Sequence, residues 1–159
     1  MHIRDFRDGD LPALLELTLA AFRPLFEGDL PDLLGHDVWS HDHGDWEADY
    51  ARQVPTFHRP GNDRYVTLAE EDGVLLGYVG WNLTAPDNGE LEMVAVHPDA
   101  RRRGVASALC REVVDRMHDR GVAVVRIGTG GDAFHEPARR LYESLGFRGY
   151  PVVAYARTL

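Results

Sequence analysis

The chain has 159 residues, of which 44% are hydrophobic and 27% are charged, and its formal net charge at pH 7 is −9. These values are those of an ordinary globular domain, so we expect a single domain over residues 1–159. The acidic balance excludes nonspecific nucleic-acid binding, which requires Lys and Arg to neutralise phosphates. The sequence also shows no signal-peptide pattern, no apolar membrane span and only one cysteine, Cys110. We therefore expect a cytoplasmic protein that does not bind membranes.

The charge is divided unevenly along the chain. Residues 1–90 contain 18 acidic residues and 6 arginines, a net charge of −12, whereas residues 91–159 contain 8 acidic residues and 11 arginines, a net charge of +3. The two parts are expected to present different surfaces, the second suited to an anionic ligand and the first to a cationic one.

Hydrophobic periodicity and turn residues predict the elements of the first half. Asp10 stands as the N-cap of a helix that has Pro in its first turn, and Asp72-Gly73 forms a hairpin turn. The expected elements are a strand at residues 3–6, a helix from residue 11 to Pro24, an irregular stretch at 24–62 with a short helix at 45–53, and antiparallel strands at 65–69 and 74–81.

The sequence of the second half of the chain predicts a parallel crossover. A strand, a basic turn that contains glycine, a helix and an apolar strand follow one another, which is the order of a parallel strand–helix–strand unit. The expected elements are strands at residues 90–96 and 122–127 on either side of a helix at 104–117, then a helix at 137–145 and a final strand at 152–156. The pattern is that of a mixed α/β fold.

Three arginines, Arg101 to Arg103, and Gly104 stand at the start of the helix expected at residues 104–117. The first N–H groups of a helix lack partners within it and carry the positive end of the helix dipole. With the guanidinium groups they would suit a pyrophosphate. A solvated basic turn is the plainer alternative, and no Gly-Lys-Ser/Thr follows that would make a Walker A loop.

Two motifs carry a family resemblance. Arg101, Gly104 and Ala106 match the signature R/Q-x-x-G-x-G/A, and residues 138–147 contain Leu-Tyr and end in Gly-Phe. With these motifs the chain resembles the GNAT superfamily of N-acetyltransferases. The resemblance implies an α/β GNAT fold: a mixed, mostly antiparallel central sheet of about six or seven strands, a parallel crossover, a splayed acetyl-CoA cleft and about four flanking helices.

The resemblance also implies where acetyl-CoA binds. The cofactor would lie between the strands that end near Val96 and Ile127, with its pantetheine on strand backbone and its pyrophosphate on the N–H groups of residues 102–107. His135 stands where the family usually has Asn, and it can still donate to a cofactor carbonyl. The expected cofactor-binding residues are Val94, Ala95, Val96, Arg101, Arg102, Arg103, Gly104, Val105, Ala106, Ser107 and His135.

Catalysis needs an acid and a base. Tyr142 matches the family's general acid, and an ordinary tyrosine is protonated at neutral pH. Glu90 holds the position where many relatives carry a carboxylate that deprotonates the amine, and Glu92 is its competitor nearer the cofactor. Strand alternation places both on one face, with Leu91 and Met93 on the other. A salt bridge at the sheet edge is the alternative role for each glutamate.

The acceptor is expected to be a small cationic primary amine, because residues 24–62 combine acids with aromatics. The same aromatics could instead be core. The expected acceptor-binding residues are Trp39, Asp45, Trp46, Glu47 and Tyr50.

The sequence is also compatible with other functions. His36, His41 and His43 could supply three nitrogens to a metal, but a polar loop is the favoured interpretation and no metal is expected. The chain could acetylate a protein N-terminus or a lysine instead of a small molecule. It could also be a catalytically weak acyl-CoA-binding regulatory module. A homodimer is compatible with the sequence.

Overall fold

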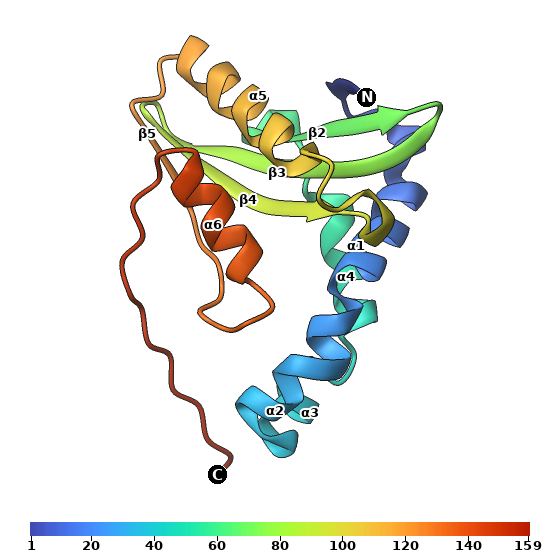
Figure 1. The fold of residues 1–159 in the computed structure, drawn as a ribbon, viewed down its shortest axis with the longest axis vertical. Coiled ribbons are helices and arrows are strands. Elements are labelled where there is room, and N and C mark those ends of the chain that lie inside the picture. Colours follow the sequence, from blue (N-terminus) through green and yellow to red (C-terminus); the bar gives the residue numbers. More distant parts are fainter.

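A five-stranded sheet in the order β1-β2-β3-β4-β5 forms the centre of the computed structural model, which describes residues 1–159 (Figure 1). The first four strands pair antiparallel, and β5 pairs parallel to β4. This is the mixed, mostly antiparallel sheet with a parallel crossover that the sequence predicts. The strands are β1 (His2–Asp5), β2 (Arg64–Glu71), β3 (Val74–Ala85), β4 (Asn88–Val96) and β5 (Val124–Ile127).

The helices lie before β2 and after β4. The α-helices are α1 (Leu11–Pro24), α2 (Leu30–Leu34), α3 (His36–His43), α4 (Trp46–Gln53), α5 (Val105–Asp119) and α6 (Glu136–Ser144). A π-helical turn covers Leu25–Asp29, and 3-10 turns cover Asp8–Asp10, Val54–Thr56, Pro60–Asn62 and Pro98–Ala100. None of these helices is long and apolar enough to cross a membrane.

The sheet separates two hydrophobic cores. On one face, α5 and α6 cover Trp81 and Leu91, and on the other, α1 and α4 cover Leu68 and Tyr78 (Figure 1). The Tyr78 hydroxyl is fully buried and shares a hydrogen bond of 2.7 Å with Thr18, so its burial leaves no polar group unpaired. Both faces of the sheet are therefore packed, and β4 is fixed between two rigid layers.

A β-bulge in β4 corrects the expected alternation of its side chains. Gly80 pairs with Met93, but the next residue of β3, Trp81, pairs with Leu91, so Glu92 is the extra residue. Leu91 packs in the core under α5, whereas Met93 packs against the core under α1. Leu91 and Met93 therefore do not share a face, because the extra residue shifts the two-residue period.

Helices replace most of the irregular stretch expected at residues 24–62. The chain continues past Pro24 through the π-helical turn into α2, then returns through α3 and α4. We call residues 25–53 the arm, and Figure 1 shows its α2–α3 end projecting beyond the sheet. Pro31 lies in the first turn of α2. Phe26 stacks on Trp46 with ring centroids 5.0 Å apart, which joins the two sides of the arm.

The final strand expected at residues 152–156 does not form. Residues 149–159 are exposed and have no regular secondary structure, and the chain end runs alone beside the domain (Figure 1). Tyr155 is 93% exposed. The β-branched and aromatic residues that predicted a strand favour an extended backbone, but a strand also needs a hydrogen-bonded neighbour. The sheet accordingly has five strands, fewer than expected.

Candidate active site

A row of unpaired backbone N–H groups marks the start of α5. The first backbone bond at this end runs from Ala108 N to Gly104 O at 3.0 Å, and no N–H of residues 102–107 donates to another group of the chain. Arg102 and Gly104 both have positive φ, 63° and 78°, so the chain turns sharply before the helix. Such a concave row of donors at a helix N-terminus binds anions. This is the geometry expected for the pyrophosphate.

The three arginines of the turn have different environments. Arg101 donates to the carbonyl of Ala21 at 2.9 Å, which fastens the turn to α1. Arg103 forms an exposed ion pair with Glu71. Arg102 has no ion pair or hydrogen bond within the chain and is exposed. Arg102 is therefore the guanidinium free to meet an anion at this turn.

The edge of β4 is open next to this turn. β5 pairs only with residues 88–91 of β4, so no strand pairs with residues 92–96 on that side. The backbone of Val94, Ala95 and Val96 along this edge can therefore pair with an extended, amide-containing ligand. The two strands separate just beyond Leu91, as a splayed cleft requires.

Tyr142 lies on α6 with its ring packed in the core under α5. Its side chain is 8% exposed, and Phe147 meets it edge-on with ring centroids 6.1 Å apart. Burial raises the pKa of Tyr142 well above the ordinary tyrosine value. The hydroxyl therefore stays protonated through the neutral range, as a proton donor must. The neighbouring Cys110 is also buried, which raises the pKa of its thiol to about 12 and leaves it a weak nucleophile.

The two candidate bases differ in their partners. Glu90 is half-buried and makes no ion pair, whereas Glu92, at the bulge, pairs with Arg64 of β2. Arg64 Nε, Glu92 Oε2 and Oδ1 of the adjacent Asn82 are buried and have no hydrogen-bond partner. Sequence reasoning missed Arg64 and Asn82, because only the register of three strands brings them beside Glu92.

His135 stands at the N-terminus of α6, where the carboxylate of Asp132 holds it. Asp132 Oδ2 lies 2.7 Å from His135 Nδ1. Burial acts to raise the pKa of Asp132, but the hydrogen bond and charge of His135 lower it overall. Arg139 donates to the carbonyls of Gly130 and Asp132 at 2.6 and 2.8 Å, which fixes the loop. The sequence signal for Asp132 is its spacing of three residues from His135.

The expected acceptor residues are divided by burial. Trp46 and Tyr50 are buried, with 5% and 9% of their surfaces exposed, and they pack inside the arm. Trp39 is half-buried and stacks on His36, with its Nε1 buried and unpaired. Asp45 and Glu47 are the two residues of the set that reach the surface there.

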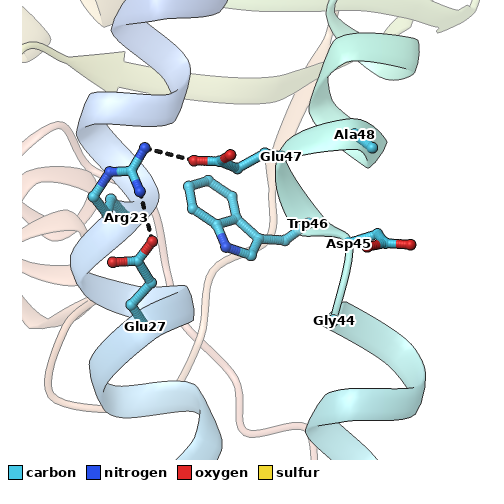
Figure 2. A pocket seen from close by; sticks show the side chains of 7 residues that line it. All are labelled: Arg23, Glu27, Gly44, Asp45, Trp46, Glu47 and Ala48. Atoms are coloured by element: carbon cyan, nitrogen blue, oxygen red, sulfur yellow. Dashed lines mark hydrogen bonds and ion pairs between the residues drawn. The ribbon is translucent and has the colours of Figure 1, made fainter.

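Figure 2 shows that Glu47 already has a cationic partner. Arg23 bridges Glu47 and Glu27, and its guanidinium lies 5.3 Å from the centre of the Trp46 ring. These residues line an open hollow of about 320 Å³ together with Asp45.

The three histidines of the metal alternative lie on α3, and no group of three or more metal-ligating side chains meets in the structure.

The chain matches the model of the acetyltransferase (GNAT) family over residues 17–147. A mycothiol acetyltransferase of Rhodococcus jostii is 31% identical over 97% of this chain and 54% of its own length. A mycothiol acetyltransferase of Thermomonospora curvata is 38% identical over 64% of this chain and 33% of its own length. The chain thus spans about half or less of the length of these relatives.

Solved structures share the fold. The PaiA N-acetyltransferase of Thermoplasma acidophilum, in complex with coenzyme A, has a TM-score of 0.68 at 16% identity, over 92% of this chain and 89% of its own. The ribosomal-protein-S18-alanine N-acetyltransferase of Escherichia coli has a TM-score of 0.67 at 22% identity, over 94% of this chain and 79% of its own.

Proposed function

This chain belongs to the acetyltransferase (GNAT) family, and from that premise we propose that it transfers acetyl from acetyl-CoA to a primary amine of a small molecule. The observation that carries the proposal is the row of unpaired N–H groups at residues 102–107 beside the open edge of β4. One feature fits a pyrophosphate and the other an extended amide chain. An acyl-CoA presents both groups in sequence.

The residues of the cleft fit direct transfer in a ternary complex. The acceptor nitrogen attacks the thioester carbonyl, the C–S bond breaks, and the departing thiolate takes a proton. The Tyr142 hydroxyl, kept protonated by burial, supplies that proton. Glu90 has no competing partner in the chain, so it is the carboxylate we assign to take the proton from the amine. No covalent enzyme intermediate is required.

His135 completes the cofactor side of the cleft. Its Nδ1 faces Asp132, so Nε2 is the ring nitrogen left to meet a ligand. We assign the ring a hydrogen bond to an amide of the pantetheine, which carries both donors and acceptors. Asp132 is a positioning residue in this assignment.

The acceptor is proposed to be cationic in solution. The arm contains eight acidic side chains and one arginine, so its field attracts a positive molecule to this part of the surface. A relative that matches 97% of this chain is named a mycothiol acetyltransferase, which supports an acetyl-transfer reaction. A protein N-terminus or lysine is the alternative acceptor, and binding without turnover is the alternative activity.

Thiol release from acetyl-CoA tests the reaction with a panel that contains spermidine, glucosamine and a peptide with a free N-terminus. Turnover on a small amine is expected, and Tyr142→Phe should lower kcat about 100-fold with an unchanged KM for acetyl-CoA. Tyr65→Phe is the matched control, because its hydroxyl makes only a weak exposed bond of 3.3 Å to Asp63. Tight coenzyme A binding with no turnover on any amine would overturn the proposal.

A further inference from the structure

The half-buried polar cluster formed by Arg64, Asn82 and Glu92 has more hydrogen-bonding capacity than the chain uses. Arg64 and Glu92 pair with each other, yet Arg64 Nε, Glu92 Oε2 and Asn82 Oδ1 are each buried without a partner. A buried polar atom without a partner costs free energy, and native structures contain few of them. Three such atoms on adjacent strands indicate a place where an outside group completes the bonding.

The position of the cluster identifies what that group belongs to. Glu92 is the bulged residue of β4, directly after Leu91, the last residue that pairs with β5. The cluster therefore lies where β4 and β5 separate and where the open edge begins. A group bound to it would stand beside the pantetheine end of the cofactor in the function proposed above, on which this inference rests.

The chemistry of the free atoms defines the ligand. Two of them, Glu92 Oε2 and Asn82 Oδ1, accept hydrogen bonds, and one, the Nε–H of Arg64, donates. An amine alone would serve the two acceptors and leave the Nε–H of Arg64 without a partner. An amine with an oxygen on the neighbouring carbon satisfies all three.

We propose that the acceptor substrate is a vicinal amino alcohol, held with its amine on Glu92 and Asn82 and its oxygen on Arg64. Glu92 then binds the substrate without acting as the base, because its charge is engaged by Arg64, and Glu90 is left to take the proton. The ion pair also holds the Glu92 carboxylate in one orientation, and its side chain and that of Arg64 are only 23% and 29% exposed. The cluster selects the acceptor by hydrogen bonding rather than by net charge.

Calorimetric titration of two amines into the coenzyme A-saturated protein tests this assignment. The probes are 2-aminocyclohexanol and cyclohexylamine, which differ only in the hydroxyl group. The wild-type chain should bind the amino alcohol at least tenfold more tightly, a difference of about 1.4 kcal/mol. Arg64→Lys should abolish that preference, because lysine keeps the charge but has no Nε–H in this position. Asn82→Leu and Glu92→Gln should weaken binding of both amines.

Glu112→Gln is the matched control, since Glu112 also pairs with an arginine, Arg116, but lies on α5. It should bind both amines as the wild type does, and thermal unfolding should show which variants are folded. Equal affinity of the wild type for the two amines would overturn the inference, as the cluster would then hold water only. Because binding is measured without turnover, selective binding with no thiol release would refute the proposed reaction and keep this site. Thiol release by a protein that binds both amines equally would support the proposed reaction and refute this site.

Discussion

The turn before α5 and the arm both concentrate charge, but they differ in what that charge contacts. In the turn, Arg102 and the backbone N–H groups of residues 102–107 have no partner in the chain. In the arm, Glu27 and Glu47 are bridged by Arg23 of α1, and Arg52 pairs with Asp49. The aromatic rings of the arm likewise pack on one another. The turn therefore has charged and polar groups that are free to bind a ligand, whereas many of those in the arm bind one another.

Unpaired groups therefore locate a binding site in this chain better than composition does. The acidic and aromatic content of residues 24–62 suggested a binding pocket, yet Trp46 and Tyr50 are core. The cluster of Arg64, Asn82 and Glu92 is not marked by composition, but it contains three of the four buried side-chain atoms that lack partners. If this comparison is correct, changes in the arm should affect stability, and changes in the turn should affect ligand affinity.

The largest expected effect is on the stability of the arm. Trp46→Ala removes a buried ring that stacks on Phe26, and such truncations cost about 3–5 kcal/mol. Denaturant unfolding should show this loss, while the folded fraction keeps the wild-type affinity for acetyl-CoA. A weaker acetyl-CoA affinity with unchanged stability would break the comparison, because Trp46 would then act on the cofactor site.

Alkaline pH should also destabilise the arm. Burial raises the pKa of Tyr50 to about 12 from the ordinary value of about 10. The unfolded chain therefore releases this proton first, so the stabilisation is fully present below pH 10 and is lost as the pH rises to about 12. The shift corresponds to at most about 3 kcal/mol. Tyr50→Phe should reduce the slope of stability against pH in this window, and an unchanged slope would contradict the assignment.

A smaller effect is expected from a glycine of the turn. Gly104 has φ of 78°, so Gly104→Val strains the backbone and moves the N–H groups that begin α5. The Kd for acetyl-CoA should rise at least about tenfold. Gly35→Val is the control in the arm, because Gly35 also has a positive φ, 80°, and open space around its Cα. Equal losses of cofactor affinity in both variants would show that general strain, not the turn, is responsible.

The smallest effect should come from the field of the arm. Asp45 is exposed and has no ion pair, so Asp45→Arg should raise the KM for a cationic acceptor only about two- to threefold and leave that for acetyl-CoA unchanged. This increase in KM should disappear at high salt, where exposed charges are screened. A large increase in KM that persists in salt would mean that Asp45 contacts the acceptor.

The sequence alone determined the elements whose signals are local. The apolar periodicity of α1 and α5, the helix expected at 137–145, the Asp72-Gly73 turn and the parallel crossover into β5 were confirmed within a few residues. The two family motifs also sufficed to identify the family, because helix starts and their glycine turns are short, contiguous patterns. The unpaired N–H groups at residues 102–107 belong to the same kind of local pattern, a glycine turn followed by a helix start.

Features that depend on pairing between distant segments could not be predicted from local sequence. The bulge at Glu92 follows from the register of β3 on β4, and the same register brings Asn82 and Arg64 to its side. The helices of the arm are held together by Phe26 and Trp46, which stack across it. The prolines of this segment instead suggested an irregular stretch. The tail at residues 152–156 has strand-forming residues and no neighbour to pair with. Local sequence fixes what a segment can form, but contacts with other segments decide which polar groups remain free to bind a ligand.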